Sequence, residues 1–428
     1  MAYKIGLLGL GTVGGGTAEI LLDPKGRHPL LQELSIYRVG LRDLSKPRPV
    51  KLPADILTTD LEAIVTDSAV DIVVELIGGL EPARSLILKA IAHGKHVVTA
   101  NKAVISRYGD EIYTAANNAG VYVMLEAAVG GGIPVIGPLK QALVVNRIQS
   151  VIGIVNGTTN YILTKMQREG IDFADVLAEA QQLGYAEADP TADVDGLDAA
   201  DKIAILASLA FGGRLKLEDV YCEGIRHVTV ADIAYAEKLG FEIKLLAIAQ
   251  GSVEDSLQVR VHPTLVPQIH PLASISGVYN AILVEGEPIG QVMFYGRGAG
   301  AGPTASAVVA DLMNIAAILQ TETEPIPHPL LSCHHQHYCP IAPIEELQTR
   351  FYVRFLTNDK PGVIGHLGTS FGNNNVSLES LVQIGFKGQL AEIVVLTHET
   401  REGNFRNALK EINTLDAVDS IPSVIRVL

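Results

Sequence analysis

A glycine-rich turn near the start of the chain constrains the fold most strongly. The apolar run Tyr3–Leu8 predicts a buried strand, the turn Gly9-Leu10-Gly11-Thr12-Val13-Gly14 follows at once, and residues 17–22 predict a helix. Between a strand and a helix, the pattern G-x-G-x-x-G is typical of a dinucleotide-binding turn. The first glycine allows the turn, the second admits a pyrophosphate, and the third lets helix and strand pack closely. All six residues of the turn are therefore candidate cofactor-binding residues.

The predicted second strand, residues 35–41, ends at a charged turn that bears on the choice of cofactor. An acidic residue at this place binds the ribose 2′-hydroxyl of NAD, whereas a cation attracts the 2′-phosphate of NADP. Arg42, Lys46 and Arg48 outnumber the single carboxylate of Asp43. We therefore expect Arg42 and Lys46 to bind NADP(H) by preference, with NAD(H) still possible. A solvated charged turn is the plainer alternative.

Strands and helices keep alternating up to residue 125. Strand-like runs at 70–76, 96–99 and 121–125 are separated by helix-like segments at 83–93 and 111–119. This alternation predicts a parallel, doubly wound sheet, in which ligands bind beyond the carboxyl ends of the strands. Lys102 follows one strand by three residues, so we expect it near the cofactor, although an ordinary surface lysine is the plainer interpretation.

The composition excludes several classes of protein. The chain has 428 residues, 48% of them hydrophobic, which at ~150 residues per domain suggests about three domains. A formal net charge of −14 argues against a nucleic-acid or acidic-membrane partner. No stretch reaches the ~18 consecutive apolar residues of a membrane helix. Three cysteines and the lack of a cleavable signal lead us to expect a cytoplasmic enzyme.

The loop at residues 126–134 follows the last strand of this alternating region. It begins with Glu126 and contains three consecutive glycines, which allow the backbone to turn its carbonyls inward. A carboxylate beside such a loop can hold a hard cation through oxygen ligands. Judged from the residues alone, a tight turn into the next helix is the better supported interpretation.

Ionisable residues are densest between positions 184 and 202. This stretch contains one glutamate, five aspartates and Lys202, and an apolar helix is predicted at 199–210. Asp198 and Lys202 are four residues apart, so they share one helix face. They can form a plain ion pair, or they can act as a substrate clamp. In a clamp the carboxylates bind an ammonium group, and the lysine exchanges a proton with a hydroxyl. The polar cluster at 156–160 can likewise bind a substrate or cap a helix.

These residues resemble the signature of the homoserine dehydrogenase family, and the resemblance covers nearly the whole chain. The pair Asn101-Lys102 and the segments 126–134 and 156–161 also match, whereas Leu125 stands where an aromatic residue is common. The residues at the spacing of the family's main signature are Ala180, Gly184, Asp189-Pro190, Asp193, Gly196, Asp198 and Lys202.

The resemblance implies a reaction and the residues that perform it. The reaction is the reversible NAD(P)H-dependent reduction of L-aspartate 4-semialdehyde to L-homoserine, in threonine, methionine and isoleucine biosynthesis. Lys202 is implied as the proton donor, Lys102 lies beside the reacting carbonyl and the cofactor, and Gly302 lies near the cofactor. The implied substrate contacts are Glu187, Asp198, Asp193, Gly184 and Thr158. A monovalent cation, sodium by preference, is implied at Glu126 and the carbonyls of Val129, Gly131 and Ile133.

The C-terminal part follows a different pattern. Strands at 351–356, 376–382, 391–397 and 423–428, with helices after Gly362 and at 404–412, predict the order βαββαβ. This module resembles an ACT domain, which implies L-threonine as a feedback inhibitor. A dimerisation module that binds no ligand is the alternative. Deleting residues 350–428 should then leave activity and remove sensitivity to threonine.

These expectations define the predicted fold class and domains. A doubly wound Rossmann-like domain at 1–130 and 303–320 is joined to an α+β catalytic and dimerisation domain at 131–302, a linker at 321–349 and an ACT domain at 350–428. We expect a homodimer or homotetramer. The linker contains Cys333-His334-His335-Gln336-His337-Tyr338-Cys339, which invites a zinc hypothesis. A solvated or packed linker is favoured, because the spacing matches no standard zinc finger.

Two competing functions remain open. An aspartate-semialdehyde dehydrogenase would need a nucleophilic cysteine, and neither Cys222 nor the two linker cysteines stand in a suitable setting. A non-catalytic amino-acid sensor with a vestigial dehydrogenase body would have no use for an intact Lys102, Glu187, Asp198 and Lys202.

Overall fold

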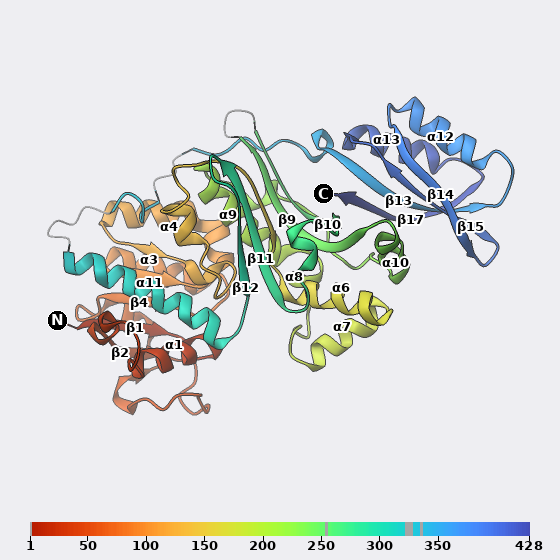
Figure 1. The fold of residues 1–428 in the computed structure, drawn as a ribbon. Coiled ribbons are helices and arrows are strands. Elements are labelled where there is room, and N and C mark those ends of the chain that lie inside the picture. Colours follow the sequence, from red (N-terminus) through yellow and green to blue (C-terminus); the bar gives the residue numbers. More distant parts are fainter. Residues whose placement is uncertain (1, 253–255, 322–327, 334–336) are drawn as a thin grey trace. The chain divides into compact units, whose positions relative to one another are not determined.

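The computed structural model describes residues 2–252, 256–321, 328–333 and 337–428, which form two compact units (Figure 1). Unit 1 comprises Met1–Val151, Asp201–Glu218 and Asn280–Cys339, and unit 2 comprises Ile152–Ala200, Asp219–Tyr279 and Pro340–Leu428. This division is coarser than the expected one of three domains and a linker, which stays a prediction.

Unit 1 is built on six parallel strands in the order β3-β2-β1-β4-β5-β6. This is the strand order of doubly wound dinucleotide-binding folds, and it confirms the predicted parallel sheet. The strands are β1 (Tyr3–Leu8), β2 (Leu34–Gly40), β3 (Leu57–Thr58), β4 (Ile72–Glu75), β5 (His96–Thr99) and β6 (Val123–Met124). The helices that alternate with them are α1 (Thr12–Leu22), α2 (Leu61–Thr66), α3 (Ala83–Ala92) and α4 (Lys102–Ala119).

Helix α11 (Ala301–Thr321) returns to this sheet from far along the chain (Figure 1). Its Val308, Leu312 and Ile315 belong to the same buried apolar cluster as Ile5 and Val39 of the sheet. By length and composition α11 could cross a membrane, but 56% of the tested window is buried inside the protein. We therefore interpret α11 as a core helix that covers the sheet.

Unit 1 also contains elements that the division into two units cuts along the chain. Strands β12, β11 and β7 are neighbours in one sheet, and β7, β11 and helix α9 each continue across the boundary along the chain. These elements are α5 (Ile136–Lys140), β7 (Arg147–Ile154), α9 (Leu197–Phe211), β11 (Tyr279–Glu287) and β12 (Gly290–Arg297).

Unit 2 is organised around a mixed sheet whose strands follow the order β9-β10-β17-β13-β15-β14. Its strands are β8 (Tyr221–Cys222), β9 (Phe241–Ser252), β10 (Ser256–Pro267), β13 (Gln348–Asn358), β14 (Leu378–Lys387), β15 (Leu390–Thr397), β16 (Thr400–Arg401) and β17 (Val418–Val427). Its helices are α6 (Gly157–Glu169), α7 (Phe173–Gln182), α8 (Thr191–Val194), α10 (Val230–Lys238), α12 (Val363–Asn373) and α13 (Glu402–Ile412).

The C-terminal module confirms the predicted order βαββαβ. Its helices α12 and α13 lie over one face of β13, β14, β15 and β17 (Figure 1). An aromatic core joins them, since the rings of Phe351 on β13 and Phe405 on α13 stack with centroids 3.9 Å apart. The module is not an independent domain within unit 2, because its strand β17 pairs in parallel with β10, with Thr264 opposite Arg426. One sheet therefore runs from the β9–β10 hairpin into the module.

Several predicted helix starts were wrong. Helix α1 begins at Thr12 and not at residue 17, and α13 begins at Glu402 and not at residue 404. Two more of these errors concern site residues. Helix α4 begins at Lys102 and not at residue 111, because the side chain of Asn101 accepts a hydrogen bond from the Val104 amide and caps the helix. Helix α9 begins at Leu197, two residues earlier than expected. Both corrections place a site residue, Lys102 or Asp198, inside the first turn of a helix.

Candidate active site

The glycine-rich turn has a different geometry at each of its three glycines. Gly9 has φ +101°, and a Cβ there would lie 2.8 Å from the Leu76 carbonyl oxygen. A Cβ on Gly14 would lie 2.1 Å from the Gly9 carbonyl oxygen, so helix and turn are in direct contact. A Cβ on Gly11 would meet nothing within 4 Å, and Gly11 directly precedes α1. The space beside Gly11 and the free amides of α1 can thus receive a phosphate group.

The turn after β2 leaves its cations exposed. Asp43 accepts hydrogen bonds from the amide and hydroxyl of Ser45 at 2.8 and 2.7 Å. These bonds, led by the one from the hydroxyl, lower the pKa of Asp43. Arg42 and Lys46 are exposed. Asp43 is exposed as well, but its carboxylate is already hydrogen-bonded within its own turn, and the half-buried Arg48 donates to the Asp43 carbonyl. Arg42 and Lys46 can therefore contact a bound anion.

Glu75, at the end of β4, is a buried site residue that the sequence analysis missed. It is fully buried, accepts hydrogen bonds from the amides of Ile77 and Gly78, and accepts another from the Thr99 hydroxyl at 2.7 Å. Burial raises the pKa of this carboxyl above its usual value. A carboxylate inside an otherwise apolar strand was the signal that could have revealed it, because such a group is buried only when it is hydrogen-bonded.

Glu75 and its neighbours determine where α4 begins. Thr99 also accepts a hydrogen bond from the Asn101 amide at 3.0 Å, and the Asn101 side chain donates to the Gly79 carbonyl at 2.7 Å. Lys102, the first residue of α4, is therefore held at the carboxyl ends of β4 and β5. Ligands bind at that edge in sheets of this kind.

Asp201 ties α9 to α4 within unit 1. Its Oδ1 accepts hydrogen bonds from the Ser106 hydroxyl at 2.7 Å and from the Arg107 guanidinium at 2.8 Å. Asp201 and Lys202 are both buried, at 7% and 9% exposure. Lys202 is adjacent to Asp201 along the chain, and Lys102 lies one helical turn before Ser106, so this contact joins the two helices that carry the predicted catalytic lysines.

In unit 2 the structure brings two of the predicted substrate carboxylates together. The Asn156 side-chain amide donates to Asp193 at 2.7 Å and to Asp198 at 2.8 Å. Its Oδ1 accepts from the Thr159 amide at 2.8 Å and caps α6. The structure confirms the capping interpretation of the 156–160 segment, since Asn156 caps α6 and also holds the two carboxylates. Substrate binding by this segment stays a prediction.

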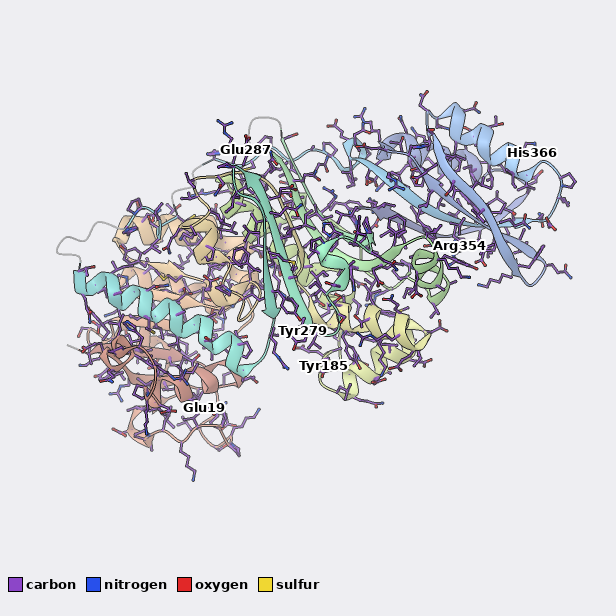
Figure 2. The ribbon with its side chains drawn as sticks, viewed as in Figure 1. Glu19, Tyr185, Tyr279, Glu287, Arg354 and His366 are labelled. Atoms are coloured by element: carbon purple, nitrogen blue, oxygen red, sulfur yellow. The ribbon has the colours of Figure 1, made fainter. Side chains whose placement is uncertain are left out.

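The remaining predicted substrate contacts lie on the segment after α7. Thr158 donates through its hydroxyl to the Tyr185 carbonyl at 2.7 Å, which holds this segment against α6; Tyr185 is labelled in Figure 2. Gly184 has φ +74° and ends the turn of α7. Glu187 is exposed, and its carbonyl accepts a hydrogen bond from Gln181 at 3.0 Å. Hydrogen bonds therefore tie the segment that carries Gly184 and Glu187 to both α6, which carries Thr158, and α7.

In the loop predicted to hold a cation, the carboxylate of Glu126 already accepts hydrogen bonds from backbone amides. Glu126 accepts hydrogen bonds from the amides of Val135 and Ile136 on Oε1 and of Gly137 on Oε2, all at 2.7–2.8 Å. It therefore caps α5, as the plainer interpretation of a turn into a helix requires. Its own amide donates to the fully buried Asp311 at 2.8 Å. Burial, and then the charge of Glu126, raise the pKa of Asp311 to about 8.

Asp311, on α11, was not foreseen in the sequence and adds a second buried carboxyl to this loop. Gly130 and Gly131 have φ +72° and +57°, and a Cβ on Gly131 would lie 2.4 Å from the Gly298 carbonyl oxygen. The loop with Val129, Gly131 and Ile133 is thus packed closely against the segment that leads into α11. Two buried carboxyl groups beside a carbonyl-rich loop form an oxygen donor set that suits a hard monovalent cation.

Cys222 and Cys339 do not have the surroundings of nucleophiles. The Cys222 thiol donates to the Asp195 carbonyl at 3.3 Å, and burial is the main cause that raises its pKa to about 11. Burial also raises the pKa of Cys339. A nucleophilic cysteine needs a lowered pKa. Within the described ranges, no three His, Cys, Asp or Glu side chains are grouped to hold a metal. His334 and His335 of the zinc hypothesis lie outside those ranges.

Three sequence families match successive parts of the chain. A family described as "Homoserine dehydrogenase, NAD binding domain" matches residues 9–126, "Homoserine dehydrogenase" matches residues 134–313, and "ACT domain" matches residues 351–417. Homoserine dehydrogenase from Synechocystis sp. is 71% identical over 432 residues and covers 100% of both chains.

Solved structures agree with this assignment. A homoserine dehydrogenase from Thiobacillus denitrificans has a TM-score of 0.92 at 43% identity, covering 100% of this chain and 98% of that one. A hyperthermophilic archaeal homoserine dehydrogenase in complex with NADPH has a TM-score of 0.64 at 29% identity, and covers 75% of this chain and 99% of that one. With two family matches spanning the nucleotide-binding and catalytic parts and a relative similar over its full length, this chain belongs to the homoserine dehydrogenase family.

Proposed function

We propose that this chain catalyses the reversible NAD(P)H-dependent reduction of L-aspartate 4-semialdehyde to L-homoserine. The observation that carries the proposal is the group of Asn156, Asp193 and Asp198 at the start of α9, the helix that bears Lys202 one turn later. Clustered carboxylates suit the ammonium group of a small amino acid, and a buried lysine next to them suits proton transfer at its other end.

Each residue has a defined task in this scheme. Asp198 and Asp193, fixed by Asn156, bind the ammonium group together with Glu187, while Thr158 and Gly184 add polar contacts. The nicotinamide supplies the hydride when it is bound. Lys202 donates a proton to the developing alkoxide in the reduction and removes it in the oxidation. Lys102, at the carboxyl ends of β4 and β5, stabilises the negative charge on the reacting oxygen.

The direct test is NADPH oxidation with aspartate semialdehyde as the substrate. We expect turnover by the wild type and a fall in kcat of about 10²-fold or more in Lys202→Met, because general acid catalysis is lost. Lys216→Met is a matched control, since Lys216 is an exposed lysine of unit 1 with an exposed partner, Glu218. Absence of turnover in the wild type would refute the proposed activity, whereas full activity of Lys202→Met would refute only the role of that lysine.

NADP(H) is the proposed preferred cofactor. The support is the exposure of Arg42 and Lys46 at a turn whose only carboxylate, Asp43, is engaged by Ser45. Binding in the turn 9–14 and near Gly302 would place the ribose beside these cations. Arg42→Ala should raise the KM for NADPH by about tenfold and leave the KM for NADH within about twofold, since only NADPH carries the 2′-phosphate. Equal effects on both cofactors would contradict this preference.

A monovalent cation, sodium by preference, is the proposed occupant of the loop after β6. Oxygen atoms of Glu126, Val129, Gly131 and Ile133 would hold it, and the buried Asp311 nearby accepts a hydrogen bond from the Glu126 amide. Its task would be to fix the loop between β6 and α5 rather than to take part in the chemistry. Replacing sodium by choline should lower the unfolding temperature, and no change between the two salts at equal ionic strength would argue against the site.

The regulatory part of the proposal concerns the ACT domain. We propose that it binds L-threonine as a feedback inhibitor, and that the enzyme works in the cytoplasm as a homodimer or homotetramer. The match to the ACT family and the tight entry into α12, with Gly362 at φ +93°, support an amino-acid site in this module. Light scattering of the purified protein measures the assembly, and a monomer at micromolar concentration would contradict it.

A further inference from the structure

Arg426, near the end of β17 in the ACT domain, is a buried guanidinium shared by two glutamates. Its exposure is 5%. Its Nε and Nη2 donate to the two carboxylate oxygens of Glu402 on α13 at 2.8 and 2.6 Å, and its Nη1 donates to Glu223 at 2.8 Å. Glu402 belongs to the ACT domain, whereas Glu223 follows β8 in the catalytic part of unit 2. Arg426 therefore connects the regulatory module to the catalytic chain within one compact unit.

Tyr221 on β8 strengthens this connection. Its hydroxyl accepts hydrogen bonds from Arg426 and from Arg406, both at 3.1 Å, and donates to Glu223. The Arg426 guanidinium also lies over the Tyr221 ring, 4.9 Å from the ring centroid. Two arginines of the ACT domain thus fix both ends of the segment 221–223.

The same segment supports the loop that precedes α9. The Cys222 thiol donates to the Asp195 carbonyl at 3.3 Å, and the Ile225 amide donates to the Val194 carbonyl at 2.8 Å. The segment 221–225 and the loop 194–196 approach each other too closely for a side chain at either Gly224 or Gly196. A Cβ on Gly224 would lie 2.1 Å from the Val194 oxygen, and one on Gly196 would lie 3.0 Å from the Cys222 sulfur. A shift of segment 221–225 must therefore move the loop 194–196.

That loop lies between the two carboxylates assigned to the substrate. Asp193 directly precedes it and Asp198 follows two residues after it, and Asn156 bonds to both. We propose that Arg426 is a positioning residue, which holds Glu223 and thereby fixes the loop that presents Asp193 and Asp198 to the substrate. This inference rests on the proposed substrate contacts. It gives the ACT domain a physical route to the affinity for substrate.

The charges explain why the loss of Arg426 would act mainly on Glu223. Burial opposes ionisation of Glu223, but the charge and hydrogen bonds of Arg426 outweigh it and lower the pKa of this carboxyl. Glu402 keeps Arg406, whose guanidinium binds it at 2.5 Å. Without Arg426, the carboxylates of Glu402 and Glu223 would face each other, and the remaining cations, Arg406 and the buried Arg260, would act on the side of Glu402. Glu223 would then turn toward solvent, since its side chain is already 41% exposed.

Arg354 provides a matched control. It is another buried arginine of the ACT sheet, at 2% exposure, and it also binds one carboxylate of its own module, Glu392, and one of the catalytic part, Asp232 on α10 (Figure 2). Its contacts are with α10 and β15, not with the segment 221–225. Loss of either arginine should destabilise unit 2 similarly, because each removes a buried cation that compensates two carboxylates.

The experiment compares Arg426→Gln with Arg354→Gln by steady-state kinetics on the full chain. We expect Arg426→Gln to raise the KM for homoserine about tenfold, with kcat within about threefold and the KM for NADP unchanged. Arg354→Gln should keep the KM for homoserine within about twofold at a similar loss of unfolding temperature. Equal rises in both variants, or an unchanged KM in Arg426→Gln, would overturn the proposal.

Two further variants keep the result interpretable. If Arg426→Gln does not fold, Glu223→Gln tests the same link while the pair of Arg426 and Glu402 stays intact, and it should also raise the KM for homoserine; an unchanged KM there overturns the proposal. Asp198→Asn tests the underlying site separately. A wild-type KM for homoserine in Asp198→Asn would refute the assigned substrate contact, whatever the comparison of the two arginines shows.

Discussion

At the scale of the residue, Asp201 joins two helices through one oxygen atom. It accepts from Ser106 and Arg107 of α4 and precedes Lys202 on α9. In the sequence, Asp201 is only one of five aspartates between positions 184 and 202, and no separate role was predicted for it. In the structure it is the contact that relates the two lysine-bearing helices within unit 1.

We expect Asp201→Ala to lower kcat about tenfold or more, because a small displacement of a catalytic group is costly and both donors lose their acceptor. Asp201→Asn is the control, since its amide oxygen can still accept, and it should keep kcat within about threefold. Kinetics at saturating substrate measures both. Wild-type kcat in Asp201→Ala would show that this contact does not position the lysines.

The raised pKa of Cys222 predicts how the alkylation rate of its thiol depends on pH. Its pKa of about 11 means that the thiol stays protonated at neutral pH and that the thiolate fraction grows as the pH rises. Alkylation of Cys222 by iodoacetamide should therefore be slow at pH 7.5 and should rise about tenfold per pH unit between about pH 8 and pH 10. Peptide mapping follows this residue separately from the two linker cysteines.

The unfolded chain is the control for this measurement. In urea the thiol should titrate near its ordinary value of about 8.5 and react faster at neutral pH. A plateau in the alkylation rate of the native protein near that pH would show that Cys222 is not shielded, and would reopen the possibility of a thiol nucleophile.

At the scale of the element, the strand–turn–helix unit at the N-terminus separates packing from cofactor binding. Gly14 touches the Gly9 carbonyl, whereas the space at Gly11 is open. Gly14→Ala should lower the free energy of unfolding by about 2 kcal/mol, because the new methyl group overpacks the turn. Gly11→Ala should leave stability within about 0.5 kcal/mol and raise the KM for NADPH, since its methyl group points into the free space.

Chemical unfolding and cofactor kinetics distinguish these two effects. If Gly11→Ala binds NADPH as the wild type does, the open space beside Gly11 is not the phosphate site. If Gly14→Ala is as stable as the wild type, the turn can relax in a way that the close contact with Gly9 does not suggest.

The helices also show where sequence patterns are insufficient. Five of the six strands of the parallel sheet were predicted, because runs such as 70–76 are apolar and end at glycines, whereas the two-residue strand β3 and helix α2 were missed. The first nine residues of α4 were missed, since Ser106, Arg107 and Gly109 resemble a loop when their surroundings are unknown. In the structure, capping by Asn101 and contact with Asp201 stabilise this half of the helix.

At the scale of the whole molecule, the predicted independence of the C-terminal module needs revision. Deletion of residues 350–428 was expected to leave activity. The module instead supplies β17 as the neighbour of β10, and supplies Arg354 and Arg426 to carboxylates of the catalytic part. Removing it from this chain would expose those charges, so point variants are the better test of regulation.

For feedback by the ACT domain, we expect millimolar L-threonine to inhibit the wild type and D-threonine to have no effect. Initial rates at increasing threonine measure it. A wild type indifferent to L-threonine would favour a dimerisation module that binds no ligand.

The sequence by itself determined the parallel sheet, the glycine turn, the acidic segment before Lys202 and the C-terminal βαββαβ module. These features depend on short-range patterns, namely the alternation of apolar residues, the spacing of glycines and the helical spacing of four. Only the tertiary structure decided the partners of the buried charges. Glu75 meets Thr99 24 residues away, Asp201 meets Ser106 95 residues away, and Arg426 meets Glu223 203 residues away. Strand order and helix packing choose such partners, and neither is encoded in the spacing of residues along the chain.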